Sequence, residues 1–277
     1  MPVESALGLA WAAFVGEGAK LGGKSAVSAM PWAKLYRAVK GRLTAKRVVI
    51  TGMPGVGKTV LRKRLCGDAS IHFSLPRTSQ YLKRQLRTGD RCYVDLWDVP
   101  GQAADEQRIA HEKLSGRGCY GVIHAVSYGY AQLRDSSAQE IVSQLSGPDL
   151  LDEYRKGQLI EEVNDLRRTL ERIRAIPKKR RPRWIIITPT KLDLYANQAK
   201  RAAEYYSLSG NSPFAYELRE FRARPECAEI GFHVYPVCTT IEPLTIGQVK
   251  VPSQFSDTER SESLALYGER LEDHCGG

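Results

Sequence analysis

An eight-residue box, Gly52–Thr59 (GMPGVGKT), carries the clearest chemical signal in the chain. It lies between a short apolar run, Val48–Ile50, and a segment of helical character, Val60–Cys66. Glycines let backbone amides turn inward around phosphate oxygens, and the N-terminus of a helix adds a favourable dipole. With G-x-x-x-x-G-K-T spacing, Lys58 reaches the β- and γ-phosphates and the Thr59 hydroxyl ligates Mg²⁺. The box predicts a nucleoside triphosphate site; the alternative is a glycine-rich turn of the same spacing, which the flanking strand and helix disfavour.

A second motif follows a segment that alternates in polarity as a strand does, residues 91–98. The segment ends on Asp98, which opens a D-x-x-G motif closed by Gly101, and Gln102 follows directly. An aspartate at this place can hold Mg²⁺ through water, and the Gly101 amide can approach the γ-phosphate. The side-chain amide of Gln102 can orient an attacking water. A lone D-x-x-G is a common tight turn, so the preceding strand is what favours the functional interpretation.

The base is addressed by a third motif. Trp184–Ile187 is a short apolar run typical of a buried strand, and Thr190-Lys191-Leu192-Asp193 follows it as T-K-x-D. The Asp193 carboxylate can accept hydrogen bonds from N1–H and the 2-amino group of guanine, a pair of donors that adenine lacks. The stem of Lys191 can lie along the plane of the base.

A fourth segment, Val234–Thr240 (VYPVCTT), is predicted to be a further strand that ends in small residues. Backbone amides near Cys238 and Thr239 are candidates to meet guanine O6. The four motifs in this order resemble the Ras-like, translation-factor-related class of P-loop GTPases, over Ala45–Cys275.

The resemblance implies an α/β fold of three layers, with a mostly parallel sheet flanked by helices. It implies that the chain is an enzyme, a GTPase, that uses GTP or GDP and Mg²⁺. Catalytic roles fall to Lys58, Gln102 and Thr78, and Mg²⁺ ligation falls to Thr59, Thr78 and Asp98. The implied nucleotide contacts are Gly52, Pro54, Gly55, Val56, Gly57, Lys58, Thr59, Val60, Gly101, Thr190, Lys191, Asp193, Cys238 and Thr239.

Three positions need comment beside the family pattern. Thr78 is the better match to the switch I threonine, and Thr88 is a weaker one because it falls in the predicted hairpin turn Arg87–Arg91. Thr190 stands where most relatives have Asn, although a T-K-x-D variant occurs in some large GTPases. Pro54 stands where many small GTPases have Gly, at the side from which a partner's arginine enters. Its rigid ring leaves intrinsic GTP hydrolysis possible but puts in question the stimulation of hydrolysis by such an arginine.

The remaining elements are predicted from periodicity and turn residues. The basic run Lys178–Arg183 is either an anionic-surface patch or a solvated turn after a helix, and the turn is favoured. The predicted elements are a hairpin of Ser79–Leu86 with Arg91–Trp97, a strand at Gly121–Val126, a polar loop at Tyr128–Pro148, a long helix at Leu150–Ile176, a loop or small hairpin at Ile241–Phe255 and a last helix at Thr258–His274.

Length and composition suit one domain with an extension. The chain has 277 residues, 42% of them hydrophobic, and we divide it into an N-terminal helical extension, 1–44, and a GTPase domain, 45–277. Its six cysteines show no metal-ligand spacing, which favours reduced thiols in a cytoplasmic protein. The net charge of +10 allows weak contact with acidic partners. No RRM, KH or helix-turn-helix pattern is present, so no specific nucleic-acid partner is expected.

The extension holds two segments of different character. Ala6–Val15 is apolar but only ten residues long, far short of a membrane span. Pro31–Leu43 has an apolar face with basic residues elsewhere. It is either a helix docked on the GTPase domain or a basic amphipathic anchor, for peripheral contact with an anionic membrane or for a partner, and the pattern does not separate the two.

The function expected from the resemblance is that of a molecular switch that hydrolyses GTP to GDP and phosphate. Its switches, about Arg77–Tyr81 and Asp98–Gln107, order around the γ-phosphate and contact a protein effector or regulator. The alternative is an assembly or membrane-scaffold protein that uses GTP chiefly to form a nucleotide-dependent homodimer.

Overall fold

The computed structural model describes residues 6–15, 46–65, 83–88, 92–98, 114, 119–133 and 149–276, with residues 83–88 and 92–98 described by their backbone. The helices are α1 (Ala6–Val15), α3 (Lys58–Leu65), α6 (Leu150–Ala175), α7 (Ala199–Tyr206), α8 (Pro213–Arg222) and α9 (Asp257–Gly276). The strands are β1 (Lys46–Thr51), β2 (Lys83–Thr88), β3 (Cys92–Asp98), β4 (Cys119–Val126), β5 (Trp184–Pro189), β6 (Gly231–Val234), β7 (Leu244–Ile246) and β8 (Val249–Val251). Short 3-10 turns are η1 (Lys178–Arg180), η2 (Leu192–Leu194) and η3 (Ala196–Gln198).

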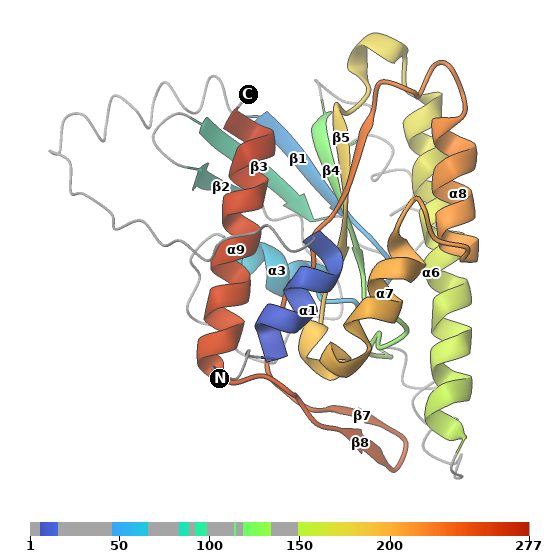
Figure 1. Ribbon diagram of the computed structural model, residues 1–277. Coiled ribbons are helices and arrows are strands. Elements are labelled where there is room, and N and C mark those ends of the chain that lie inside the picture. Colours follow the sequence, from blue (N-terminus) through green and yellow to red (C-terminus); the bar gives the residue numbers. More distant parts are fainter. Residues whose placement is uncertain are drawn as a thin grey trace, which may run out of the picture.

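A six-stranded sheet forms the middle layer, in the order β2-β3-β1-β4-β5-β6 (Figure 1). β1 pairs in parallel with β3 and β4, and the parallel pairing continues through β5 to β6. Only β2 is antiparallel in this sheet, because it forms a hairpin with β3. Since β1, β3, β4, β5 and β6 run the same way, the segments that follow them gather at one end of the sheet, where a ligand of an α/β sheet binds.

Helices cover both faces of the sheet. Figure 1 shows α6 and α8 on one side and α3 and α9 on the other. Successive residues of β1 serve the two faces: Val49 belongs to the larger hydrophobic core, whereas Val48 and Ile50 belong to the second core. Strand alternation sends side chains to opposite faces, so a strand covered on both sides is apolar throughout. The predicted three-layer α/β architecture is confirmed.

The first helix packs into both cores. Leu7 and Ala10 of α1 are buried in the larger core, and Trp11 is buried in the second. The helix lies against α7 and the η3 turn, and Leu7 N donates to Glu259 Oε1 at 3.4 Å. The segment Ala6–Val15 is therefore folded onto the domain. Pro31–Leu43, for which the sequence left two interpretations, lies outside the described residues, and the boundary at residue 44 stays a prediction.

Several element predictions are confirmed and two need correction. The long helix, the hairpin of β2 with β3, the last helix and a small hairpin between residues 241 and 255 are all present. The strand predicted at Val234–Thr240 is wrong, because β6 ends at Val234 and the chain is irregular beyond it. The loop predicted to be polar from Tyr128 is also wrong at its start, because Tyr128, Tyr130 and Ala131 are buried.

The basic run after α6 forms a turn at the end of this helix. Arg181 donates from Nε to Ile176 O at 2.8 Å and from Nη2 to Arg174 O at 2.8 Å. Lys178 forms an ion pair with Glu229 at 2.9 Å. A cation bound to the last carbonyls of a helix complements its dipole, as the favoured interpretation of this run required. None of the helices in the described part of the chain is long and apolar enough to span a membrane.

Candidate functional site

The phosphate loop connects the end of β1 to the start of α3. Gly52 and Gly55 have φ values of +130° and +79°, which side-chain-bearing residues rarely adopt. Close backbone neighbours add a second constraint: a Cβ on Gly52 would lie 2.3 Å from Ala125 O, and one on Gly55 would lie 2.0 Å from Gln132 O. Both glycines are thus required by conformation and by close contact, Gly52 with β4 and Gly55 with the segment that follows β4.

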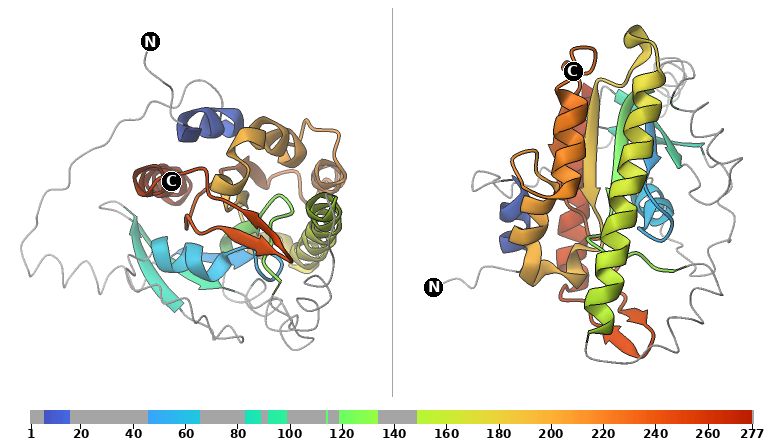
Figure 2. Two further views of the ribbon diagram at one scale, coloured as in Figure 1. Left: turned by 90° about the horizontal axis from the view of Figure 1, so that it is seen from below. Right: turned by 90° about the vertical axis from the view of Figure 1, so that its right-hand side faces the viewer.

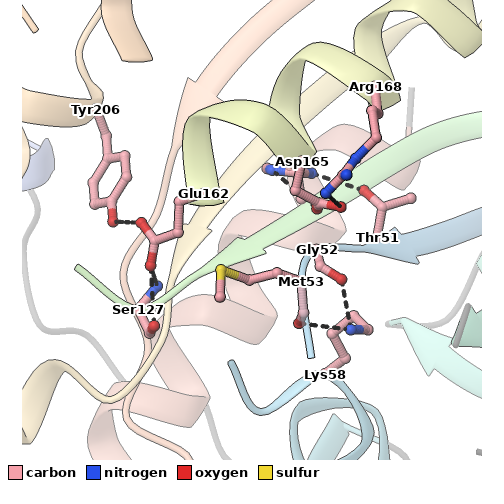
Figure 3. Close-up of polar contacts among 10 residues, drawn as sticks. Thr51, Gly52, Met53, Lys58, Ser127, Glu162, Asp165, Arg168 and Tyr206 are labelled. Atoms are coloured by element: carbon pink, nitrogen blue, oxygen red, sulfur yellow. Dashed lines mark hydrogen bonds and ion pairs between the residues drawn. The ribbon is translucent and has the colours of Figure 1, made fainter. Parts of the chain in front are cut away.

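Lys58 lies inside this loop. Its Nζ donates to Gly52 O at 2.6 Å and to Met53 O at 2.9 Å, and its side chain is buried (Figure 3). Holding the ammonium by carbonyls of its own loop keeps the cation at the place where phosphate oxygens bind in a loop of this type. Thr59 is the next residue, in the first turn of α3, and it is partly exposed. Pro54 and Val60 are partly exposed as well, whereas Val56 is buried.

Thr190 ties the phosphate loop to the T-K-x-D motif. It follows β5 directly and is fully buried. Its Oγ1 lies 2.5 Å from Val56 O and 2.9 Å from Val126 O, and its N–H donates to Val126 O at 2.7 Å. A hydroxyl has one hydrogen, so it serves the two carbonyls as alternative or shared acceptors. The short side chain at this position therefore joins the phosphate-binding and base-binding parts of the site.

The segment that follows β4 makes a second connection between these parts. Gln132 N donates to Gly55 O at 3.2 Å, and Lys191 Nζ donates to Tyr130 O at 2.7 Å. Lys191 has a φ of +54°, a left-handed conformation that is unusual for a residue with a side chain. Such backbone strain persists where the surrounding structure holds it, and it is concentrated at functional sites.

Glu162 of α6 fixes this segment from behind. Its Oε1 accepts from Ser127 N at 2.9 Å, Ser127 Oγ at 3.0 Å and Gly129 N at 3.2 Å, and its Oε2 accepts from Tyr206 Oη at 2.6 Å (Figure 3). Burial raises the pKa of this carboxyl, and the hydrogen bonds from Tyr206, Ser127 and Gly129 oppose the rise. With four donors the carboxylate is fully satisfied, so it acts as a buried anchor for the loop.

His124 of β4 lies deeper, beneath the phosphate loop. Its Nδ1 is 3.0 Å from Thr51 Oγ1, and its Nε2 is 4.0 Å from Asp165 Oδ2, which is too long for a hydrogen bond. Burial, the largest cause, lowers the pKa of His124 to about 4, so the ring is neutral at pH 7.

Asp193 is the residue best placed to read a base. The residue is 1% exposed; its Oδ1 accepts from Cys238 Sγ at 3.4 Å, and its Oδ2 has no hydrogen-bond partner within the described part of the chain. Burial raises the pKa of the carboxyl, and hydrogen-bond donors around it oppose the rise. An unpaired buried acceptor costs free energy until a donor reaches it. The N1–H and 2-amino group of guanine are donors of the required kind, so the residues present fit a guanine nucleotide.

The role predicted for the last motif needs a correction. The amide of Cys238 donates to Ser263 Oγ of α9 at 2.8 Å, so it is already engaged and does not face guanine O6. Thr239 is buried, its carbonyl accepts from Arg64 Nε at 3.3 Å, and its hydroxyl lies near Gly57 of the phosphate loop. The amide of Thr239 is therefore the better candidate for O6.

The metal ligands are placed in part. Asp98 ends β3 opposite Ile50 of β1, so its backbone lies beside the start of the phosphate loop. Thr78, Gly101 and Gln102 lie outside the described residues. Among the described residues, no group of three or more His, Cys, Asp or Glu side chains is arranged to hold a metal. Thr59 and Asp98 are accordingly the candidates that this part of the chain offers to Mg²⁺, whose other ligands come from phosphate and water.

Thr88 is excluded as a switch residue by strand register. It pairs with Cys92, at the start of β3, whereas the phosphate loop lies beside Asp98, at the end of β3. At about 3.3 Å per residue the two ends of β3 are roughly 20 Å apart. Thr78 thus keeps the switch I role as a prediction.

Glu162, Gln132 and Ser263 were not identified from the sequence. Glu162 carried a usable signal, because it falls between Leu159 and Leu166 on the apolar stripe of α6, where a charge has no solvent to face. Gln132 contributes a backbone amide, and Ser263 lies on a helix of mixed polarity. The sequence pattern around these two residues does not indicate their contacts, which are Gly55 for Gln132 and Cys238 for Ser263.

Known proteins resemble this chain at two levels, a sequence family and solved structures. Searching curated proteins gave no match. Among solved structures the chain is similar to Toc33 from Arabidopsis thaliana in complex with GDP and Mg²⁺, with 10% identity, a TM-score of 0.45 and coverage of 88% of this chain and 90% of that one. It is similar to the mammalian SRP receptor, with 14% identity, a TM-score of 0.43 and coverage of 70% and 92%.

A bacterial selenocysteine-specific elongation factor, EF-Sec, is a further similar structure, with 17% identity and a TM-score of 0.40. The match covers 71% of this chain but only 26% of the elongation factor. A family model described as 50S ribosome-binding GTPase matches residues 47–187, slightly more than half of the chain, from the start of β1 into β5. The chain belongs to this family of P-loop GTPases.

Proposed function

We propose that this protein is a molecular switch that binds GTP, hydrolyses it to GDP and phosphate, and changes the conformation of its switch segments when the γ-phosphate is lost. The observation that supports the choice of base is the buried Oδ2 of Asp193, which has no hydrogen-bond partner among the described residues. Asp193 follows Thr190 by three residues, and Thr190 is hydrogen-bonded to Val56 of the phosphate loop. A carboxylate acceptor at this place suits guanine and leaves adenine without its matching donors.

The chain's own groups account for the phosphate chemistry. Phosphoryl transfer depends on positioning and charge stabilisation more than on covalent help. Lys58 supplies a positive charge to the β- and γ-phosphates, and Gly101 supplies an amide to the γ-phosphate. Gln102 orients the attacking water. Thr59, Thr78 and Asp98 would hold Mg²⁺, which when bound would supply positive charge near the phosphate oxygens.

Competition titration tests the choice of base. GTP and GDP should displace a fluorescent guanine nucleotide at far lower concentrations than ATP and ADP do. Loss of a charge-assisted hydrogen bond to a buried carboxylate costs about 1.5–3 kcal/mol, which is roughly tenfold to more than a hundredfold in affinity. Equal displacement by ATP and GTP would refute a guanine-specific site.

Single-turnover hydrolysis tests the chemistry. Gln102→Leu should bind GTP as the wild type does and hydrolyse it about tenfold more slowly or worse, since leucine cannot hydrogen-bond water. Lys58→Ala is the matched control, because it should lose triphosphate binding itself. A Gln102→Leu variant with the wild-type rate would assign the positioning of water to another group.

The same preparation addresses assembly. Size-exclusion chromatography with GDP and with a non-hydrolysable GTP analogue reports the mass in each state. A mass that doubles only with the GTP analogue would favour the alternative in which nucleotide chiefly controls dimerisation. Contact of residues 31–43 with anionic vesicles is a separate part of the proposal, measured by sedimentation at low and high salt.

A further inference from the structure

Residues 241–256, between the last nucleotide motif and α9, form an element that the four motifs do not include. Its two short strands, β7 and β8, pair as a hairpin at the end of the molecule that faces the viewer in the left panel of Figure 2. Leu244 and Ile246 of β7 are buried in the larger core, whereas Thr245 between them is exposed. The hairpin is therefore anchored on the domain by one face.

The chain that leaves this hairpin forms three hydrogen bonds with the backbone of Asp193 and of the turns that follow it. Gln254 N donates to the carbonyl of Asp193 at 2.9 Å. The side-chain amide of Gln254 donates from Nε2 to Leu194 O at 3.2 Å and accepts at Oε1 from Asn197 N at 3.1 Å. One glutamine thus spans the η2 and η3 turns, which contain and follow Asp193.

Gln254 is itself held on both sides. Phe255 is buried in the larger core, and its amide donates to Ser253 Oγ at 3.3 Å. Ser256 then begins α9 with a capping box: Glu259 N donates to Ser256 Oγ at 3.3 Å, and Ser256 N donates to Glu259 Oε2 at 2.9 Å. The position of Gln254 is consequently set by a helix start and a core side chain.

These contacts bear directly on Asp193. Its Oδ1 accepts from the Cys238 thiol, the nearby Ser253 side chain opposes the rise in its pKa that burial causes, and its Oδ2 has no hydrogen-bond partner among the described residues. A thiol is a weak donor, so the orientation of the carboxylate depends strongly on where its backbone lies. The backbone carbonyl of Asp193 and the turn behind it are the atoms that Gln254 binds.

We propose that Gln254 is a positioning residue for guanine recognition, which holds Asp193 so that its carboxylate meets the 2-amino group and N1–H of the base. This proposal rests on the proposed function, because it assumes that the nucleotide is guanine. It makes residues 241–256 a specificity element of the site.

The test compares GDP with inosine diphosphate, which lacks only the 2-amino group. The full chain is titrated with each nucleotide as wild type and as Gln254→Ala, which removes the side-chain bonds to Leu194 O and Asn197 N and keeps the backbone bond to Asp193 O. The dissociation constant for inosine diphosphate divided by that for GDP should fall by about three- to tenfold in the variant. This is the effect expected when the hydrogen bond from the 2-amino group to a displaced carboxylate is weakened. Gln248→Ala is the matched control: it removes the same exposed side chain from the tip of the same hairpin and should leave the ratio unchanged.

A Gln254 that only stabilised the fold would give a different result. If Gln254→Ala weakened GDP and inosine diphosphate by the same factor, or weakened neither, the positioning role would be overturned. If the wild type bound ADP as well as GDP, the proposed function itself would fail, which is a separate outcome. Exchange of the Asn197 amide should be faster in Gln254→Ala than in Gln248→Ala. If the alanine variant does not fold, the same ratio of dissociation constants is measured for Gln254→Asn. Its shorter amide cannot span both turns.

Discussion

Replacing Thr190 by valine removes one hydroxyl from the connection between the phosphate loop and the base motif and leaves the shape of the side chain intact. Val126 O keeps the Thr190 N–H as a donor at 2.7 Å, so the loss falls on Val56 O, which is 2.5 Å from the hydroxyl. Depriving a buried acceptor of its donor costs about 1–3 kcal/mol. For a domain of this size a loss of 2 kcal/mol lowers the thermal midpoint by roughly 4–8 °C.

Thermal unfolding followed by circular dichroism, with GDP titration on the same samples, measures both consequences. Thr190→Val should unfold earlier and bind GDP more weakly, because the phosphate loop is no longer tied to the base motif. Thr190→Ser keeps the hydroxyl and is the matched control, and Thr190→Asn restores the residue that most relatives carry here. The reasoning is refuted if Thr190→Val matches the wild type in both midpoint and GDP affinity.

Three further substitutions test other parts of the structure. Asp193→Asn should shift preference from guanine to xanthine nucleotides. Because burial raises the pKa of Asp193 above 3.8, the wild-type free energy of unfolding falls as pH rises from 3.8 through the raised pKa of the folded protein. The asparagine variant should lack this fall in urea titrations over a pH series. His124, with its pKa lowered from 6.5 to about 4, binds fewer protons folded than unfolded, so stability should be lost as pH falls through this interval, by about 3 kcal/mol at most; an equally steep loss in His124→Gln would assign the effect elsewhere. Trp11→Ala should lower the free energy of unfolding by about 3–5 kcal/mol with the GDP to inosine diphosphate ratio unchanged, and an unchanged stability would contradict the packing of α1 on the domain.

The parts of the structure that the sequence predicted correctly are those in which short-range chemistry dictates conformation. Gly52–Thr59 needs left-handed glycines and a following helix, and both requirements are visible as residue types at fixed spacing. β4 and β5 are apolar on both faces, so their runs were recognised without knowledge of their neighbours. The order of these elements then allowed a single familiar topology.

The errors arose where long-range contacts override local pattern. Tyr128 and Tyr130 looked like the start of a polar loop, yet they are buried because Tyr195, Tyr206 and Arg155 surround them. Val234–Thr240 read as a strand because of its apolar residues. The apolar residues are instead buried within an irregular segment, in which Val237 and Cys238 are inside the protein. No local rule reports such partners, which lie tens of residues away.

Thr190, Lys191 and Asp193 are each held by a different part of the chain. Thr190 is bonded to the phosphate loop, Lys191 to the segment after β4, and Asp193 through its carbonyl to Gln254. Three separate parts of the chain therefore fix three nearly consecutive residues. Since a binding site whose geometry is fixed in advance loses less entropy when its ligand binds, the tethers favour affinity for the base. In the proposed function, the response to the γ-phosphate depends instead on Thr78, Gly101 and Gln102. This division suits a switch, because the base can remain bound while only the residues near the γ-phosphate change their contacts.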